Sequence, residues 1–135
     1  MPIMPWSDDF VLGIKQIDEQ HRWLVDNINA LYDESSKNTP DQSVIGEILE
    51  GLVDYTFNHF IVEEEVFQRH DYPQTGAHKD EHNKFNQRIA EVLERYENTG
   101  KLDSSVMVFL KDWLSHHILT VDKAYVPFFK SKGVE

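Results

Sequence analysis

Five histidines and two acidic residues have the types and spacing expected of metal ligands in a helical protein. Imidazole and carboxylate groups bind first-row transition metals. A single histidine in an apolar helical series is more often a hydrogen-bonded core residue, but five in such positions favour a metal site, because burying an imidazole without a partner costs free energy. The candidate ligands are His21, His59, Glu63, His78, His82, His117 and Asp122. Seven side chains exceed the needs of one ion, so the set predicts two.

The spacing of the candidates indicates which of them share a helix face. Two pairs are four residues apart, which places both members of a pair on one face. These pairs are His59 with Glu63, and His78 with His82. His117 and Asp122 are five residues apart, which is about 140° around an ideal helix. The two side chains can therefore share a site in one of two ways: the helix contains a π-type bulge, or the side chains extend from either side of the inward-facing edge of the helix. In a regular helix without such a geometry, Asp122 would point to solvent.

The two remaining histidines lack the spacing of metal ligands. His70 lies in an expected turn and should be exposed. His116 adjoins His117, but neighbouring side chains on a helix point about 100° apart. We expect neither His70 nor His116 to bind a metal ion.

Four helices are expected to carry the candidate ligands, because apolar residues recur at steps of three and four. The expected inward series are Ile17, His21, Leu24, Ile28 and Leu31; His78, His82, Phe85, Ile89, Val92 and Tyr96; and Val106, Leu110, Trp113 and His117. The segment from Thr39 to Gln42 is interpreted as a capping box with Pro40 at the first helical position. The expected helices span residues 18–37, from about 39 to 68, 77–97, and from Asp103 or Ser104 to 129.

Short connections between these helices predict antiparallel neighbours. Residues 70–76 form a turn by their proline and glycine content, and residues 98–100 end the third helix. Residues 1–17 contain Gly13 and two prolines, which argue against a long helix there. The predicted fold is an all-α, up-down-up-down antiparallel four-helix bundle. We expect a single domain over residues 1–135, with an irregular N-terminal arm at 1–17 and the bundle at 18–130.

The candidate ligands should lie at one height along the axis of such a bundle. In two antiparallel helices joined by a short turn, residues that are equally far before and after the turn lie at the same height. His21 lies 19 residues before Pro40, and His59 lies 19 residues after it. The pairs His59/Glu63 and His78/His82 are placed symmetrically about the turn at 70–76. The pairs His78/His82 and His117/Asp122 are placed symmetrically about Gly100. All four groups of ligands are therefore predicted to meet.

The amino-acid composition limits which partners, which kinds of metal site and which cellular location are expected. The formal charge is −11, from 13 basic and 24 acidic residues, which disfavours nucleic acid and anionic lipid as partners. Cysteine is absent, which excludes thiolate metal sites and disulfides. No secretory signal and no apolar run of about 20 residues is present. We expect a cytoplasmic protein without membrane insertion.

The ligand set suggests how two irons could be held. In this hypothesis Glu63, Asp122 and a solvent-derived oxo or hydroxo group bridge the ions. The first iron takes His78, His82 and His117. The second takes His21 and His59, which leaves one open position for a small ligand. The chain has no Glu-x-x-His motif, the signature of carboxylate-rich di-iron bundles, so we expect iron(II)/iron(III) cycling and reversible dioxygen capture.

Apolar side chains near the fourth-helix ligands could keep water from the open position. They are Trp113, Leu114, Ile118 and Val121. Plain core packing explains them equally well.

The chain resembles the hemerythrin family, specifically the single-domain bacteriohemerythrins. The resemblance covers nearly the whole chain and rests on Trp6 and on the stretches GIKQIDEQH (13–21), HFIVEE (59–64), HKDEH (78–82) and DWLSHHILTVD (112–122). It implies that all seven ligand positions are filled, that Asp122 bridges, and that dioxygen binds end-on at the second iron. It also implies that Leu114 lies near bound dioxygen; we place Trp113 and Ile118 in the same pocket lining.

The expected function is reversible dioxygen binding by a non-haem di-iron centre for transport, storage or delivery, without enzymatic activity. The partners would be dioxygen and a redox partner or an oxygen-using enzyme. Two alternatives stay open. One is a di-iron oxidoreductase acting on peroxide or nitric oxide, and the other is an oxygen- or redox-sensing module.

Overall fold

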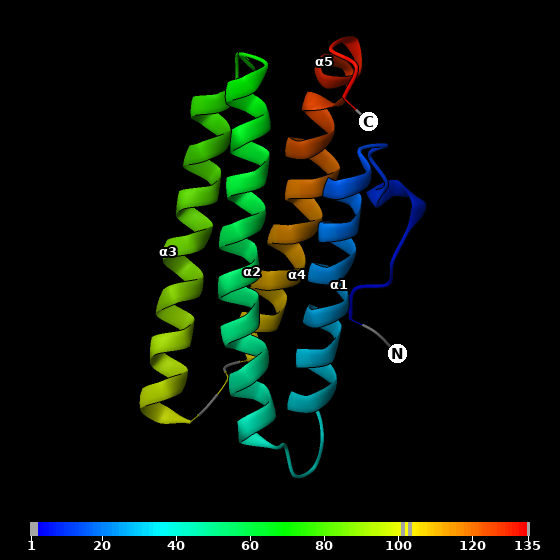
Figure 1. Cartoon of the computed structure of the whole chain (residues 1–135). Helices are drawn as coiled ribbons and strands as arrows, with labels where there is room; N and C mark the ends of the chain where they lie inside the picture. Colours follow the sequence, from blue (N-terminus) through cyan, green and yellow to red (C-terminus); the bar gives the residue numbers. More distant parts are fainter. Residues whose placement is uncertain (1–2, 101, 103, 135) are drawn as a thin grey trace.

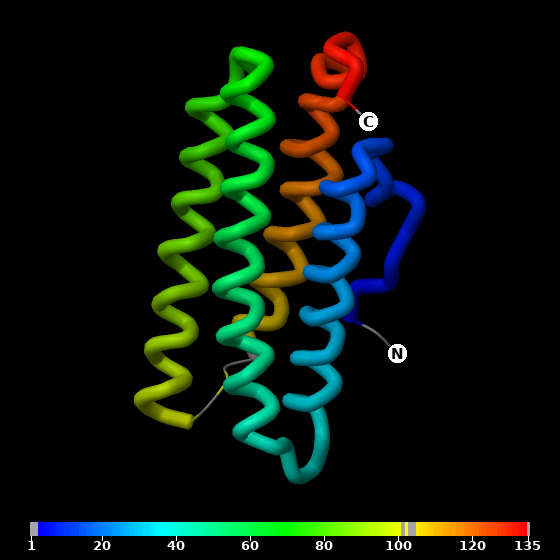
Figure 2. The backbone as a smooth tube through the Cα atoms, in the orientation of Figure 1, coloured from blue at the N-terminus to red at the C-terminus, as the bar shows by residue number. Residues whose placement is uncertain are grey.

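The computed structural model describes residues 3–100, 102 and 104–134, and these residues confirm the predicted all-α four-helix bundle. Four long helical rods run alternately up and down with short connections at their ends (Figures 1 and 2). The elements are η1 (Asp8–Phe10), α1 (Lys15–Ser35), α2 (Gln42–Arg69), α3 (Thr75–Thr99), α4 (Ser104–His116), η2 (His117–Asp122), η3 (Lys123–Tyr125) and α5 (Val126–Ser131). The segments from α4 to α5 together form the fourth rod.

The first helix begins at Lys15, three residues earlier than predicted. Asp18 lies in its first turn, where its carboxylate accepts hydrogen bonds from the backbone N–H groups of Leu12 and Gly13 at 2.8 and 3.0 Å. A carboxylate near a helix N-terminus is favourable because the helix dipole is positive there. The described irregular arm therefore ends at Ile14, and Asp18 ties it to α1.

The predicted capping box at Thr39 is wrong. The N-cap of α2 is Asp41, whose side chain accepts from the backbone N–H groups of Ser43 and Val44. Asp41 satisfies two of the otherwise unpaired N–H groups of the first turn. Pro40 consequently lies before the helix.

The other boundaries differ from the prediction by a few residues. The turn after α2 is shorter than expected, because α3 already begins at Thr75. Gly100 ends α3 in the left-handed conformation, with φ of 68°, as its position after the helix predicts. The fourth rod begins at Ser104, while the alternative start at Asp103 lies outside the described residues.

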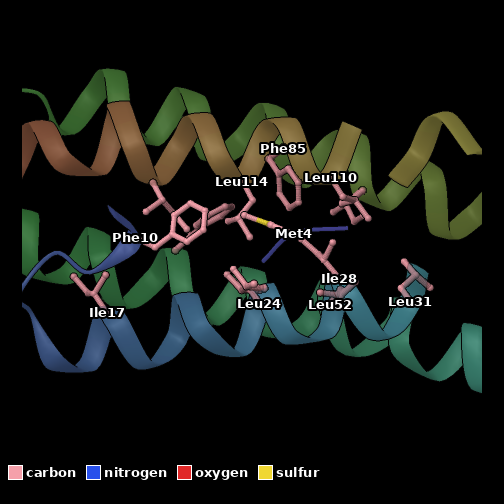
Figure 3. Packing of buried hydrophobic residues seen from close by; sticks show 14 of the residues in the cluster. Met4, Phe10, Ile17, Leu24, Ile28, Leu31, Leu52, Phe85, Leu110 and Leu114 are labelled. Atoms are coloured by element: carbon pink, nitrogen blue, oxygen red, sulfur yellow. The ribbon is translucent and has the colours of Figure 1, made fainter. Parts of the chain in front are cut away.

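The core follows the predicted inward series, whose members are buried except for the half-buried Trp113. Figure 3 shows part of this core, with apolar side chains filling the space between the ribbons of α1 and α4. The arm adds Met4, Phe10, Leu12 and Ile14 to the same cluster. The Asn29 side chain holds the arm by donating to the Met4 carbonyl at 2.9 Å and accepting from its N–H at 2.8 Å.

None of the described helices combines the length and the apolar character needed to cross a membrane.

Candidate metal centre

The seven candidate side chains lie together in the interior of the bundle, and each is between 0% and 3% exposed. They come from α1, α2, α3 and η2, so every rod contributes. The close approach confirms the predicted common height of the four groups. Their ring nitrogens and carboxylate oxygens form two clusters in which the ligand atoms lie within 4.8 Å of one another. The clusters are Glu63, His78, His82, His117 and Asp122; and His21, His59, Glu63 and Asp122.

The carboxylate of Asp122 belongs to both clusters. Its Oδ1 atom lies 3.0 Å from Nε2 of His78 and 3.0 Å from Nε2 of His117. Its Oδ2 atom lies 2.9 Å from Nε2 of His21. One oxygen thus faces each cluster, which is the arrangement a bridging carboxylate requires.

Asp122 can reach the site because η2 is a π-helical segment from His117 to Asp122. The wider π turn brings residues five apart onto one side, which confirms the predicted π-type bulge. The alternative with Asp122 in solvent is excluded, since the side chain is 0% exposed.

The carboxylate of Glu63 also lies between the two clusters. Its Oε1 atom is 2.8 Å from Nε2 of His59 and 3.6 Å from Nε2 of His82. Its Oε2 atom is 3.8 Å from Nε2 of His78. Glu63 and Asp122 therefore link a group of three histidines to a group of two, which is the division expected from the sequence.

The donor atoms fit a pair of cations. The carboxylate oxygens and the facing Nε2 atoms are all buried and lie 2.8–3.8 Å from one another. Buried polar atoms need partners, and cations placed between the two sets of atoms would bind the lone pairs of both. Nε2 of His82 and Nε2 of His117 are 3.1 Å apart. Two donors held at a right angle around one ion, each about 2.1 Å from it, are about 3.0 Å apart.

Burial and charge set the protonation of the ligands. Burial lowers the pKa of His59 and of His82, which favours neutral rings with a lone pair available to a metal. Burial alone would raise the pKa of Asp122, but His117, His21 and His78 hold it well below its usual range. The same contact with Asp122 raises the pKa of His117, although burial opposes it. Asp122 is therefore an anionic ligand at neutral pH.

Aromatic and apolar side chains enclose the cluster. The Phe60 ring stacks on His82 at 3.7 Å between centroids, and the Trp113 ring stacks on His117 at 4.5 Å. The buried Tyr125 ring lies 5.7 Å from that of His78, and burial beside the Asp122 and Glu63 carboxylates raises the pKa of its phenol. Such surroundings exclude water and orient the imidazole rings.

A small apolar cavity is lined in part by Trp113, the residue whose ring stacks on His117. Its volume is about 10 Å³, which is room for roughly one water-sized molecule. Its lining is Leu24, Ile28, Leu52, Thr56, Phe85, Leu110, Trp113 and Leu114. Leu114 and Trp113 line this cavity, whereas Ile118 is fully buried and is not among the lining residues. Val121 is half-buried.

The other two histidines lie outside both clusters. His116 is exposed, whereas the adjacent His117 is buried. His70 is half-buried beside the Phe129 ring, at 6.1 Å between centroids, and so is less exposed than predicted. Its position at the C-cap of α2 explains this packing.

Three residues around the site were not predicted from the sequence: Gln20, Phe60 and Tyr125. Gln20 Oε1 lies 2.5 Å from Nδ1 of His59. Phe60 follows a candidate ligand directly, and Gln20 precedes one. Adjacency to a ligand was the available signal, but it does not reveal which ring a side chain on another helix will contact.

Comparison with known proteins places the chain among proteins of similar length. The sequence model of the family described as Hemerythrin HHE cation binding domain matches residues 12–129. A bacteriohemerythrin from Stenotrophomonas maltophilia is 34% identical over 131 residues, which cover 97% of this chain and 84% of that protein. A bacteriohemerythrin from Methylococcus capsulatus is 33% identical over 129 residues, covering 94% and 97%. A crystal structure of wild-type hemerythrin matches with a TM-score of 0.85 at 32% identity, covering 93% of this chain and 96% of its own.

Proposed function

Because the chain belongs to the hemerythrin family, we propose that it holds two iron ions in the buried cluster and binds dioxygen reversibly. Oxygen binding fits the family, and the buried histidine and carboxylate cluster fits a di-iron site. The observation that carries the proposal is the pair of carboxylates shared between a three-histidine and a two-histidine group. When bound, ferrous iron supplies the electrons and the vacant position that dioxygen requires.

The protein's residues would divide the ligands between the two ions. We assign His78, His82 and His117 to the first ion, and His21 and His59 to the second. Glu63 and Asp122 would serve both ions, because each carboxylate lies within 4.0 Å of histidines of both groups. The ion with two histidines has fewer protein ligands, so the vacancy for dioxygen belongs there.

The apolar side chains around the second ion would keep water away from its open coordination position. We assign Leu114, Trp113 and Ile118 to the lining of the dioxygen pocket. The small apolar cavity, lined in part by Leu114 and Trp113, supports the first two. Ile118 would contribute by filling the interior next to His117. Excluding water would matter because solvent and protons promote release of dioxygen in a reduced form, such as hydrogen peroxide, which would leave the two ions oxidised.

The test is an optical titration of the iron-loaded protein. We expect the anaerobically reduced form to gain a visible absorption band in air and to lose it again when oxygen is removed. Elemental analysis should give two irons per chain. Failure to recover the reduced spectrum after deoxygenation would contradict reversible binding.

Hemerythrins are in general oxygen-binding proteins and not enzymes, and we propose the same for this chain. Sustained reduction of peroxide or nitric oxide with an added electron donor, at rates well above autoxidation, would instead establish an oxidoreductase. A redox partner and a cytoplasmic location stay predictions from the sequence.

A further inference from the structure

Both ring nitrogens of His59 face oxygen atoms. Nδ1 lies 2.5 Å from Oε1 of Gln20, which projects from α1 across to α2. Nε2 lies 2.8 Å from Oε1 of Glu63. Gln20 is half-buried, whereas His59 is 1% exposed. The ring is therefore held between an amide on its outer side and a carboxylate on the side of the metal centre.

A neutral imidazole carries one N–H and one lone pair, so it cannot donate to both oxygens. An amide oxygen accepts an N–H readily. A lone pair pointing at a carboxylate is stable only where a cation lies between them. The two contacts together correspond to a ring protonated at Nδ1, with its Nε2 lone pair directed into the centre.

We propose that Gln20 is a positioning residue for the metal centre: its amide oxygen accepts the Nδ1–H of His59 and so presents Nε2 to the second metal position. The inference rests on the proposed di-iron function. Outer hydrogen bonds of this kind fix the tautomer and orientation of ligating histidines and increase their basicity.

The second metal position should depend strongly on this contact. It has two histidines, against three at the first position. The other, His21, has an Nδ1 atom that is buried and makes no hydrogen bond with any described residue. Without Gln20, neither histidine of this position would have an outer hydrogen bond to hold its ring.

The first test is metal affinity, measured without any oxygen chemistry. Cobalt(II) is titrated anaerobically into metal-free protein in competition with a coloured chelator, for the parent and for Gln20→Leu, Gln20→Glu and Gln16→Leu. Gln16 is exposed and lies one turn earlier on the same helix, so it provides the matched control.

We expect the parent and Gln16→Leu to bind two equivalents with the same affinities. Gln20→Leu should bind the second equivalent about 10–100-fold more weakly, with the first unchanged. Gln20→Glu retains an acceptor oxygen and should keep the second affinity within a few-fold of the parent. Equal weakening of both equivalents, or equal loss in Gln20→Glu and Gln20→Leu, would overturn the proposal, because a packing role predicts that result.

The second test observes the tautomer directly and needs the parent protein alone. Zinc(II)-loaded protein with labelled histidine rings should show His59 protonated at Nδ1, with a slowly exchanging proton that exchanges at least 10-fold faster in Gln20→Leu. A ring protonated at Nε2, or exchange that is the same in both proteins, would refute the role of Gln20. A parent that binds no cobalt or zinc would refute the metal centre itself, whereas a parent with two tight sites and an identical Gln20→Leu would refute this inference alone.

Discussion

Asp122 illustrates how one side chain can define the character of the site. Its two oxygens face histidines of different clusters at 2.9–3.0 Å. The surrounding imidazoles hold its pKa well below the usual range. An anion in this position lowers the repulsion between two neighbouring cations, and it can do so from neutral pH down to acidic conditions. Glu63 also contacts histidines of both clusters, at 2.8 Å from His59 and at 3.6 and 3.8 Å from His82 and His78.

Adjacent histidines provide a sharp test of the ligand assignment. We expect His117→Ala to lower the iron content below two per chain and the affinity by at least 10-fold, because it removes a donor and one of the three imidazoles that contact Asp122. The exposed neighbour offers the control: His116→Ala should bind two irons like the parent. Iron content by elemental analysis and chelator competition measure both. Equal retention in the two variants would remove His117 from the centre.

The buried histidines also predict how the metal-free protein responds to acid. Burial lowers the pKa of His59 and His82 below the ordinary value of about 6.5. Below that pH the unfolded chain takes up protons that the folded chain does not, so these two rings lower the free energy of unfolding as pH falls. His117 acts oppositely, because its pKa is raised and its contribution persists at low pH.

With two rings against one, we expect the urea midpoint of the metal-free protein to fall between pH 7 and pH 5. The depressed pKa of Asp122 adds a further loss of stability only below its unfolded pKa of about 3.8. A midpoint that is constant or rises over this interval would show that the buried histidines are already charged in the folded state.

The π-helical segment η2 determines that both His117 and Asp122 of the fourth rod face the metal centre. A π turn can be regarded as an α-helix with one inserted residue. The insertion makes the five-residue spacing of His117 and Asp122 equivalent to the four-residue spacing of the other two pairs. The arm is the second special element, since it completes the core between α1 and α4 through Met4 and Phe10.

Changing the length of η2 by one residue tests this interpretation. Deleting the exposed Thr120 should convert the π turn to an α turn and keep Asp122 facing the centre, so that two metal ions still bind. Inserting one alanine after Thr120 should turn Asp122 by about 100° and abolish tight binding of the pair. Circular dichroism checks that both variants are helical, and metal titration distinguishes them. Loss of metal in the deletion variant but retention in the insertion variant would contradict the argument.

The whole molecule holds seven polar ligands in its interior, and this has a cost in the absence of metal. The ligand atoms are desolvated in the metal-free protein, where imidazoles and carboxylates contact one another in place of water. Metal binding to the folded state supplies stronger partners and stabilises the fold by mass action.

Removal of the metal should therefore lower the melting temperature. At a free metal concentration 100 times the dissociation constant, each site adds about 2.7 kcal/mol, which corresponds to roughly 10 °C for a chain of this size. Differential scanning calorimetry of the chelator-treated and reloaded protein measures the change. A metal-free form that melts at the same temperature as the loaded form would contradict the coupling of the centre to folding.

Much of the fold and the site could be predicted from the sequence because the relevant signals are local and periodic. Apolar residues at steps of three and four define helix faces, and residues such as Gly100 end helices through their own backbone preferences. Distance along a helix is proportional to residue number, so the common height of His21, His59 and the other ligands follows from counting residues to each turn. Even the π turn could be anticipated, because a five-residue spacing conflicts with a regular helix.

The remaining features depend on contacts between segments distant in the chain, and no periodicity encodes them. The Gln20 contact with His59 joins residues 39 apart, and the Asn29 contact with Met4 joins residues 25 apart. The oxygen of Asp122 that faces each cluster depends on where the histidines of α1, α3 and η2 lie. These positions are fixed when the four rods pack together, and so they became visible in the tertiary structure alone.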